Sequence, residues 1–348
     1  MSLVKKILSF TLIAALAAML MPLWVLRAEQ TVVLPPEEIL GEEPPVAVKP
    51  DSAVGYDAQH TVTVLLGETV EEMPLETYLI GVLAAEMPAA FPVEALKAQA
   101  VAARTYTLYK EAMYGRDGSK APASHKGAVL CGDSSHCKAY CDLAQRAAEL
   151  WGSNRAFYES KLTGAVRDTD GLVMEYEGKP IAAVFHAASA EKTEAAVDVW
   201  GNAVPYLVSV NSPGGEASAS YHAKVELLQS DFAAAFRASH PKADLSGDAG
   251  SWFSDIKRSA AGGIISLKVG GVQVEGREIR SLAGLNSTNF TVEATGALLV
   301  FSTTGYGHGV GMSQYGARAL ALEGKDFESI LKHYYTGVDL LLKSDSAE

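Results

Sequence analysis

The chain has 348 residues, which is enough for one large domain or for two subdomains of ordinary size. Its formal net charge of −12 argues against a nucleic-acid partner, because nucleic-acid binding calls for a basic face. Part of the acidic excess is local, since the segment from Ala28 to Asp57 is rich in glutamate and aspartate and has Lys49 as its single basic residue.

The first 27 residues predict a membrane anchor. Lys5 and Lys6 precede an uncharged and largely apolar run, residues 7 to 26. That length matches the hydrocarbon thickness of a bilayer, and the lysines would stay in the cytoplasm, which places the rest of the chain outside. A cleaved signal peptide is the alternative, although its apolar core normally spans only about 7–15 residues.

Residues 28–58 predict a linker, because they are rich in proline and glutamate and would not bury enough apolar surface to fold alone. The folded part is then expected over residues 59–342. It begins with a strand at 62–66 and two helical segments, 76–86 and 93–109. Met87-Pro88 breaks the two helices, because the residue before a proline is pushed out of the α region.

The middle of the chain predicts mainly strands. Strand-like runs flank a turn at 168–171, between residues 162 and 173, and further strands are expected at 173–176, 180–186, 207–210, 224–228, 264–269, 272–274, 290–294 and 298–303. Ser230 is expected to cap a helix after 228, and helices are expected again at 313–323 and 327–335. Helices at both ends with strands between them predict an α+β ectodomain, which can form two lobes around a groove.

Glu86 is the residue that most needs an explanation, because it is a lone carboxylate at a helix end among alanine, methionine and phenylalanine. Such surroundings disfavour the ionised form and raise the pKa, as a general acid requires. The alternative is a structural ion pair with Arg104. Two-carboxylate hydrolases need a second acidic residue nearby, and Glu94 and Glu194 are the candidates.

Three cysteines lie in one loop-rich stretch. Cys131 and Cys137 are preceded by His125, and this set of thiols and imidazole suits tetrahedral zinc. The spacing is not that of a common zinc finger, so a Cys131–Cys137 disulfide outside the cell is a close alternative. His136 is a rival ligand to His125.

Two further segments carry polar side chains without a strong signal of their own. The segment 185–201 follows a strand and contains His186, Ser189 and Trp200, which fits either a site or a solvated loop with the indole in the core. The glycine-rich segment 305–317 contains uncharged donors and acceptors, and it fits a sugar-binding loop better than a phosphate loop. A structural turn with Ser313 as a helix cap is the alternative.

Several segments in fixed order resemble the SpoIID family of sporulation proteins. They are YLIGVLAAEMPAAFPVEALKAQAVAARTYTL, HCKAY, VFHAASAEKTE followed by VWG and PYL, and GHGVGMSQYGA. The resemblance covers residues 60 to 340. It implies a peptidoglycan lytic transglycosylase of endospore-forming bacteria, which cleaves MurNAc–GlcNAc bonds and leaves 1,6-anhydro ends during engulfment of the forespore.

The resemblance implies roles for single residues. Glu86 matches the catalytic acid of the family, and Arg104, His186 and Ser189 match residues associated with its site. One departure is Ser189-Ala190-Glu191, where the family has Ser-Gly-Gly, and it puts the local turn in question.

The same resemblance implies a structural zinc, because His125, Cys131 and Cys137 match the zinc set of clostridial-type members. No cofactor is then required for the chemistry. In a transglycosylase the C6 hydroxyl of the sugar is the nucleophile, so one glutamate can act first as acid and then as base. The side chains suited to holding the sugar are those of His308, Gln314 and Tyr315.

The resemblance also implies a location and partners. The protein is expected to be single-pass in the mother-cell membrane, with its extracytoplasmic domain facing the forespore septum. Its expected partners are peptidoglycan glycan strands and the stage II sporulation proteins M and P. The alternative function is a non-catalytic, peptidoglycan-binding enhancer of a cell-wall amidase, since some relatives of this domain are described in that way.

Overall fold

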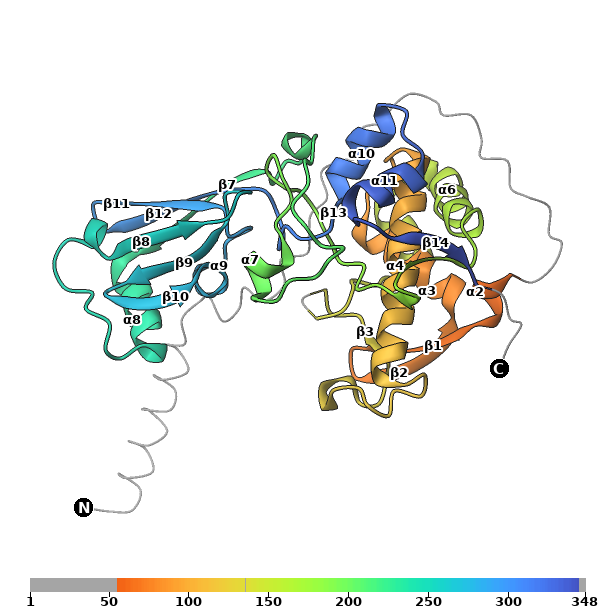
Figure 1. Cartoon of the computed structure of the whole chain (residues 1–348), viewed down its shortest axis with the longest axis horizontal. Coiled ribbons are helices and arrows are strands. Elements are labelled where there is room, and N and C mark those ends of the chain that lie inside the picture. The colour runs from red at the N-terminus through yellow and green to blue at the C-terminus, as the bar shows by residue number, and fades with distance from the viewer. Residues whose placement is uncertain (1–54, 135, 344–348) are drawn as a thin grey trace, which may run out of the picture. The chain divides into compact units, whose positions relative to one another are not determined.

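A computed structural model describes residues 55–134 and 136–343 (Figure 1). Its helices are α2 (Tyr56–Gln59), α3 (Leu75–Glu86), α4 (Val93–Tyr114), α5 (Leu143–Leu150), α6 (Arg155–Arg167), α7 (Ala196–Trp200), α8 (Gln229–Ser239), α9 (Gly276–Ala283), α10 (Gln314–Leu322) and α11 (Phe327–Tyr334). Its strands are β1 (Thr61–Leu66), β2 (Thr69–Pro74), β3 (Leu130–Cys131), β4 (Leu172–Tyr176), β5 (Lys179–Pro180), β6 (Phe185–His186), β7 (His222–Leu228), β8 (Phe253–Arg258), β9 (Ile264–Val269), β10 (Val272–Glu275), β11 (Phe290–Thr295), β12 (Leu298–Thr304), β13 (Met312–Ser313) and β14 (Asp339–Leu342).

The structure contains two hydrophobic cores, and the predicted α+β class is confirmed. The first core takes residues from Val62 to Leu207 and again from Val310 to Val338. The second core takes residues from Phe232 to Phe301, from α8, α9 and the strands around them. The second core is therefore an insertion in the chain that builds the first.

Helix α4 is the axis of the first core. It is buried on nearly all sides and contacts α3, α6, α10 and α11, which surround it in Figure 1. Its run of alanines allows this close approach, because a helix that is apolar all round is stable only when neighbours cover every face. The same kind of packing occurs at Gly81 of α3, where a Cβ would lie 2.3 Å from the ring of Tyr140.

The strands form small sheets and not one large one. The strand orders are β2-β1-β3 and β14-β4-β5 in the first core, β10-β9-β8 and β11-β12-β7 in the second, and a two-stranded β13-β6 pair. The predicted β9–β10 hairpin is confirmed, and Gly270 and Gly271 both adopt positive φ (54° and 80°), as its two-residue turn requires.

Some predicted elements are wrong. Residues up to Arg167 form helix α6 and not a strand, because this segment packs on α3 and α4. Residues 207–210 form no regular strand, and Leu228 and not Ser230 precedes α8 as its cap residue. The folded part also starts earlier than residue 59, since Asp57 of α2 is buried.

The anchor predicted for residues 7–26 and most of the predicted linker lie outside the described residues. Within residues 55–134 and 136–343, none of the helices combines the length and the apolar character needed to cross a bilayer.

Arg104 has no exposed surface, and its guanidinium binds the Asp57 carboxylate. Nε donates to Oδ1 at 2.8 Å and Nη2 donates to Oδ2 at 2.5 Å. Further hydrogen bonds run to the carbonyls of Leu172 (3.2 Å) and Val166 (3.3 Å). The predicted role of Arg104 in substrate binding, and its alternative pairing with Glu86, are therefore wrong. The partner could not be recognised because Asp57 falls in the predicted linker.

Breaking this buried pair should destabilise the fold. Asp57→Asn leaves the Arg104 charge buried without its partner, and we expect the free energy of unfolding to fall by about 3–5 kcal/mol in urea denaturation. The control is Glu159→Gln, which breaks the exposed Arg155–Glu159 pair and should cost less than about 1 kcal/mol. Equal effects of the two substitutions would contradict a structural role for Asp57.

Candidate functional site

Glu86 is the last residue of α3, and its side chain is partly exposed. The helix ends there because Met87 precedes Pro88 and adopts an extended conformation, with φ −121° and ψ 139°. The carboxylate meets a segment 53 residues further along the chain, where the N–H of Ala139 donates to Oε1 at 2.9 Å. The predicted break thus positions the carboxylate at a helix end.

Burial raises the pKa of the Glu86 carboxyl above its ordinary value. The charge of Lys138, the N–H of Ala139 and the amide of Gln314 lower this pKa in part, because each favours the carboxylate. The net direction is upward, as predicted. Glu86 therefore keeps its proton to a higher pH than an exposed glutamate, which is what a general acid needs near neutral pH.

Lys138 belongs to this site and was missed in the sequence. Its side chain is buried, and Nζ lies 3.4 Å from the ring centroid of Phe185 and 4.6 Å from that of Tyr106. Burial lowers the pKa of Lys138 to about 8, and the neighbouring Glu86 opposes that shift. Lysines are almost never fully buried unless they are paired, so a lysine in a loop is expected to be exposed to solvent, and nothing in the sequence indicates that Lys138 is buried.

A short parallel pairing brings the segments 185–194 and 305–315 together. Strands β6 and β13 place Phe185 opposite Met312 and His186 opposite Ser313. The Oγ of Ser313 accepts a hydrogen bond from the Ser189 N–H at 3.3 Å. Ser313 also caps α10, so the cap that the sequence offered as the alternative for this segment is present. Polar groups that lie far apart in the sequence therefore converge here.

His186 and Ser189 form a buried hydrogen-bonded pair. The Nδ1 of His186 lies 3.1 Å from the carbonyl of Val310, which can only accept, so this nitrogen carries the proton. The Nε2 atom then accepts from the Ser189 hydroxyl at 2.6 Å. Burial lowers the pKa of His186 to about 4, and that of His308, whose ring centroid is 5.6 Å away, well below its usual value. Both imidazoles are neutral at pH 7.

Gln314 and Tyr315 begin helix α10. The Gln314 amide is buried and acts on the pKa of Glu86, yet its Nε2 atom has no hydrogen-bond partner of good geometry among the described residues. This donor is thus available to a ligand. Tyr315 is also buried, with its ring edge-on to Phe91 at 5.1 Å. We refer to the residues Glu86, Lys138, His186, Ser189, His308 and Gln314 as the Glu86 cluster.

The two candidate second carboxylates are held elsewhere. Glu94 accepts from the N–H of Phe327 at 2.8 Å and pairs with Lys97. Glu194 accepts from the N–H of Gly263 at 3.0 Å. Glu94 thus makes structural contacts, whereas Glu194 resembles Glu86 in accepting one backbone N–H and in having a pKa that burial raises. Lys138 distinguishes Glu86, because its charge acts on that carboxyl.

Four potential metal ligands converge in the stretch after α4. The ligand atoms of His125, Cys131, His136 and Cys137 all lie within 4.8 Å of one another. His136 thus joins His125 as a fourth donor and does not replace it. The Nδ1 of His125 donates to the carbonyl of Ala128 at 3.1 Å, which leaves Nε2 directed at the other donors. Cys131, Cys137 and Cys141 are free cysteines in the described chain.

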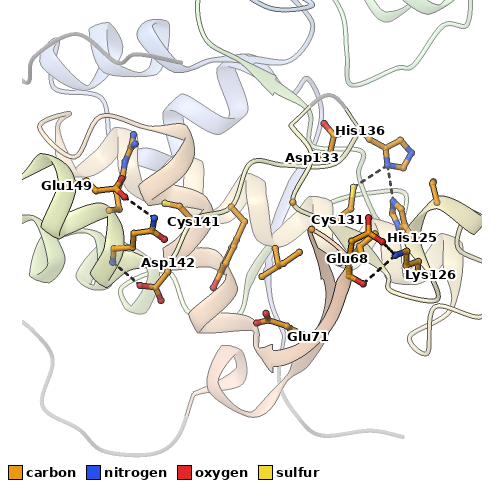
Figure 2. Close-up of a pocket in the computed structure, with 18 residues that line it drawn as sticks. Glu68, Glu71, His125, Lys126, Cys131, Asp133, His136, Cys141, Asp142 and Glu149 are labelled. Carbon is orange, nitrogen blue, oxygen red and sulfur yellow. Dashed lines mark hydrogen bonds and ion pairs between the residues drawn. The ribbon is translucent and has the colours of Figure 1, made fainter. Parts of the chain in front are cut away.

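A groove of about 1020 Å³ opens beside the metal-ligand cluster and provides a path from solvent. Figure 2 shows His125, Cys131 and His136 at one end of it and Asp142 and Glu149 at the other. Glu86 does not line this groove. The groove and the Glu86 cluster are therefore separate features.

Comparison with known proteins gives the family. The family model for SpoIID, "Stage II sporulation protein", matches residues 67–176. The chain is 37% identical to stage II sporulation protein D of Bacillus amyloliquefaciens, over 87% of this chain and 82% of that protein. It is 38% identical to stage II sporulation protein D of Bacillus subtilis, over 78% and 76%. The chain belongs to the SpoIID family of sporulation proteins, as the sequence motifs predicted.

A more distant relative has a different name. The "Amidase enhancer" of Bacillus subtilis is 29% identical, over 75% of this chain and 40% of that protein.

Removing the Lys138 charge should raise the pKa of Glu86 further, because that cation favours the carboxylate. We expect the carboxyl carbon of Glu86, followed by 13C NMR, to titrate at higher pH in Lys138→Met than in the unsubstituted protein. Lys97→Met is the control, since Lys97 pairs with Glu94 and Asp168. An unchanged or lower midpoint in Lys138→Met would contradict the electrostatic coupling.

Proposed function

We propose that this protein is a peptidoglycan lytic transglycosylase in which Glu86 is both the acid and the base. The observation that carries the proposal is the state of Glu86. It is a partly exposed carboxyl with a raised pKa, held by the Ala139 N–H beside the Lys138 cation. The substrate class is the one that the motif resemblance implies, and the relatives support membership of that family.

The reaction needs two proton transfers and no water. Glu86 donates its proton to the glycosidic oxygen as the bond from that oxygen to C1 of MurNAc breaks. The C6 hydroxyl of the same MurNAc then bonds to C1, and its proton returns to the Glu86 carboxylate. The products are a GlcNAc with a free hydroxyl and a 1,6-anhydroMurNAc end, and the enzyme regains its starting state.

The neighbours of Glu86 suit this cycle. Lys138 stabilises the carboxylate that exists between the two transfers, since its ammonium lowers the pKa of Glu86. The neutral His186 and His308 do not compete for the proton, because burial keeps their pKa values low. The unpartnered Nε2 of Gln314 is suited to a sugar oxygen near Glu86.

The biological setting belongs to the same proposal. The protein would act on glycan strands during forespore engulfment, held at the mother-cell membrane by its N-terminal segment. Its partners there would be the stage II sporulation proteins M and P. The names of the relatives support the sporulation setting.

The product assay tests the chemistry. Purified glycan strands incubated with the protein should yield fragments with the mass of anhydro ends. Glu86→Gln should lower their rate of release by about 10²–10⁴-fold, because the amide has no proton to give. Glu72→Gln, which alters an exposed carboxylate on β2, is the matched control. Release at the unsubstituted rate by Glu86→Gln would refute the mechanism.

A second candidate function is a non-catalytic enhancer of a cell-wall amidase, favoured by the relative that carries that name. Under this alternative the protein would yield no anhydro ends and would stimulate an added amidase. Glu86→Gln would stimulate the amidase as well as the unsubstituted protein does.

We also propose that His125, Cys131, His136 and Cys137 hold one zinc ion as a structural staple. Two thiolates and two imidazoles are a donor set that zinc takes in tetrahedral structural sites. The bound ion would fix the loop that ends at Cys137, and no step of the reaction passes through it. Burial raises the pKa of Cys137 to about 12 in the metal-free state, so binding would release a proton.

Metal analysis checks this site. The protein purified without added metal should contain about one zinc per chain, because a structural site whose occupation is coupled to folding binds its metal tightly. Cys137→Ser should lose the zinc, whereas the control Cys141→Ser should keep it, because the Cys141 thiol bonds the Gly81 carbonyl. A metal-free protein with a Cys131–Cys137 disulfide in its mass spectrum would remove the zinc from the proposal.

A further inference from the structure

Trp200 adjoins the Glu86 cluster but has no role in the reaction described above. Its ring centroid lies 5.6 Å from that of His308, which in turn lies 5.6 Å from that of His186. The indole is 37% exposed, whereas Trp151 and Trp252 are buried in the two cores. An exposed indole beside a site calls for an explanation that a core tryptophan does not.

Hydrogen bonds at both ends of helix α7 anchor the backbone of Trp200. The N–H of Ala196, at the start of the helix, donates to the carbonyl of Leu207 at 2.9 Å. At the other end Gly201 takes the left-handed conformation (φ 79°) and its N–H donates to the carbonyl of Val197 at 3.0 Å. Trp200 is therefore the last residue of an anchored helical turn and not part of a loose loop.

The indole has an apolar neighbour on its own helix and an uncharged imidazole on the side of the cluster, while the charges of Lys138 and Arg280 lie close enough to act on that imidazole. Val197 is 47% exposed and stands three residues before Trp200, so the two share one face of the helix. On the other side His308 is neutral, because burial lowers its pKa. A pyranose ring matches such a surface, since its axial C–H groups form an apolar face that packs on an aromatic ring while its hydroxyls stay in water.

We propose that Trp200 is the stacking platform of a second sugar subsite, which binds a ring of the glycan strand other than the ring at Glu86. The inference rests on the proposed substrate, a glycan strand, but not on cleavage by Glu86. The continuity from Glu86 through Lys138, His186 and His308 to Trp200 favours the strand over a protein partner at this surface.

Binding to a chain that cannot cleave tests the subsite. The full chain carrying Glu86→Gln is titrated with purified glycan strands by calorimetry and by tryptophan fluorescence. Adding Trp200→Ala should raise Kd about tenfold, which corresponds to a loss of about 1.4 kcal/mol of binding free energy. Trp200→Phe should restore most of the affinity, because it keeps a flat ring, but it should lose the fluorescence change. The matched control is Phe157→Ala, another exposed aromatic, on α6, and it should leave Kd unchanged.

The outcomes separate this inference from the proposed chemistry. An unchanged Kd in Trp200→Ala overturns the subsite alone. If Trp200→Ala raises Kd but the unsubstituted protein releases no anhydro products, the subsite is supported and the transglycosylase activity is refuted. No binding by the Glu86→Gln chain, together with no anhydro products from the unsubstituted protein, overturns both. If Trp200→Ala lowers the melting temperature, fluorescence decides: strands must change the emission of Glu86→Gln and not that of its Trp200→Phe derivative.

Discussion

The hydrogen bond from the Ala139 N–H to Glu86 is the contact on which the site depends. It joins the end of α3 to a segment 53 residues away, and the same segment brings Lys138 to the carboxylate. A carboxyl at an apolar helix end would otherwise be costly to ionise. The backbone donor and the cation make the anion tolerable without abolishing the rise in pKa. A group that must alternate between acid and base needs that intermediate condition.

The elements around this contact are held together by helices packed on one another, because the sheets have only two or three strands each. Helix α4 is covered by α3 and α6, from the earlier part of the chain, and by α10 and α11, from the later part. Both parts of the chain that build the first core therefore pack on one buried helix. In the sequence, the residues of the second core lie between Leu207 and Val310, and the residues of the first core come before and after them. Arg104 and Asp57 tie α4 to the start of the folded chain, which explains a fully buried arginine without any chemistry.

Local signals were predictable from the sequence, and tertiary ones were not. The break after Glu86, its raised pKa and the β9–β10 hairpin follow from neighbours in the chain, and all three are present in the structure. The Arg104 partner and the buried position of Lys138 depend on residues far away in sequence. The strand prediction for residues 162–167 was wrong for the same reason, since these residues belong to helix α6, which is stabilised by packing on α3 and α4. His136 appeared as a rival to His125 because spacing alone does not show that two imidazoles can face the same point.

The parallel pairing of β6 with β13 also has a consequence for biosynthesis. Ser189 and Ser313 are 124 residues apart, and the second core is made between them. A nascent chain therefore has β6 long before its partner strand exists, and contacts of such long range form slowly. Until α10 emerges, His186 lacks its neighbouring strand and Glu86 lacks Gln314. The Glu86 cluster is therefore incomplete until the second core and the start of α10 have been synthesised, which makes it one of the last parts of the described chain to assemble.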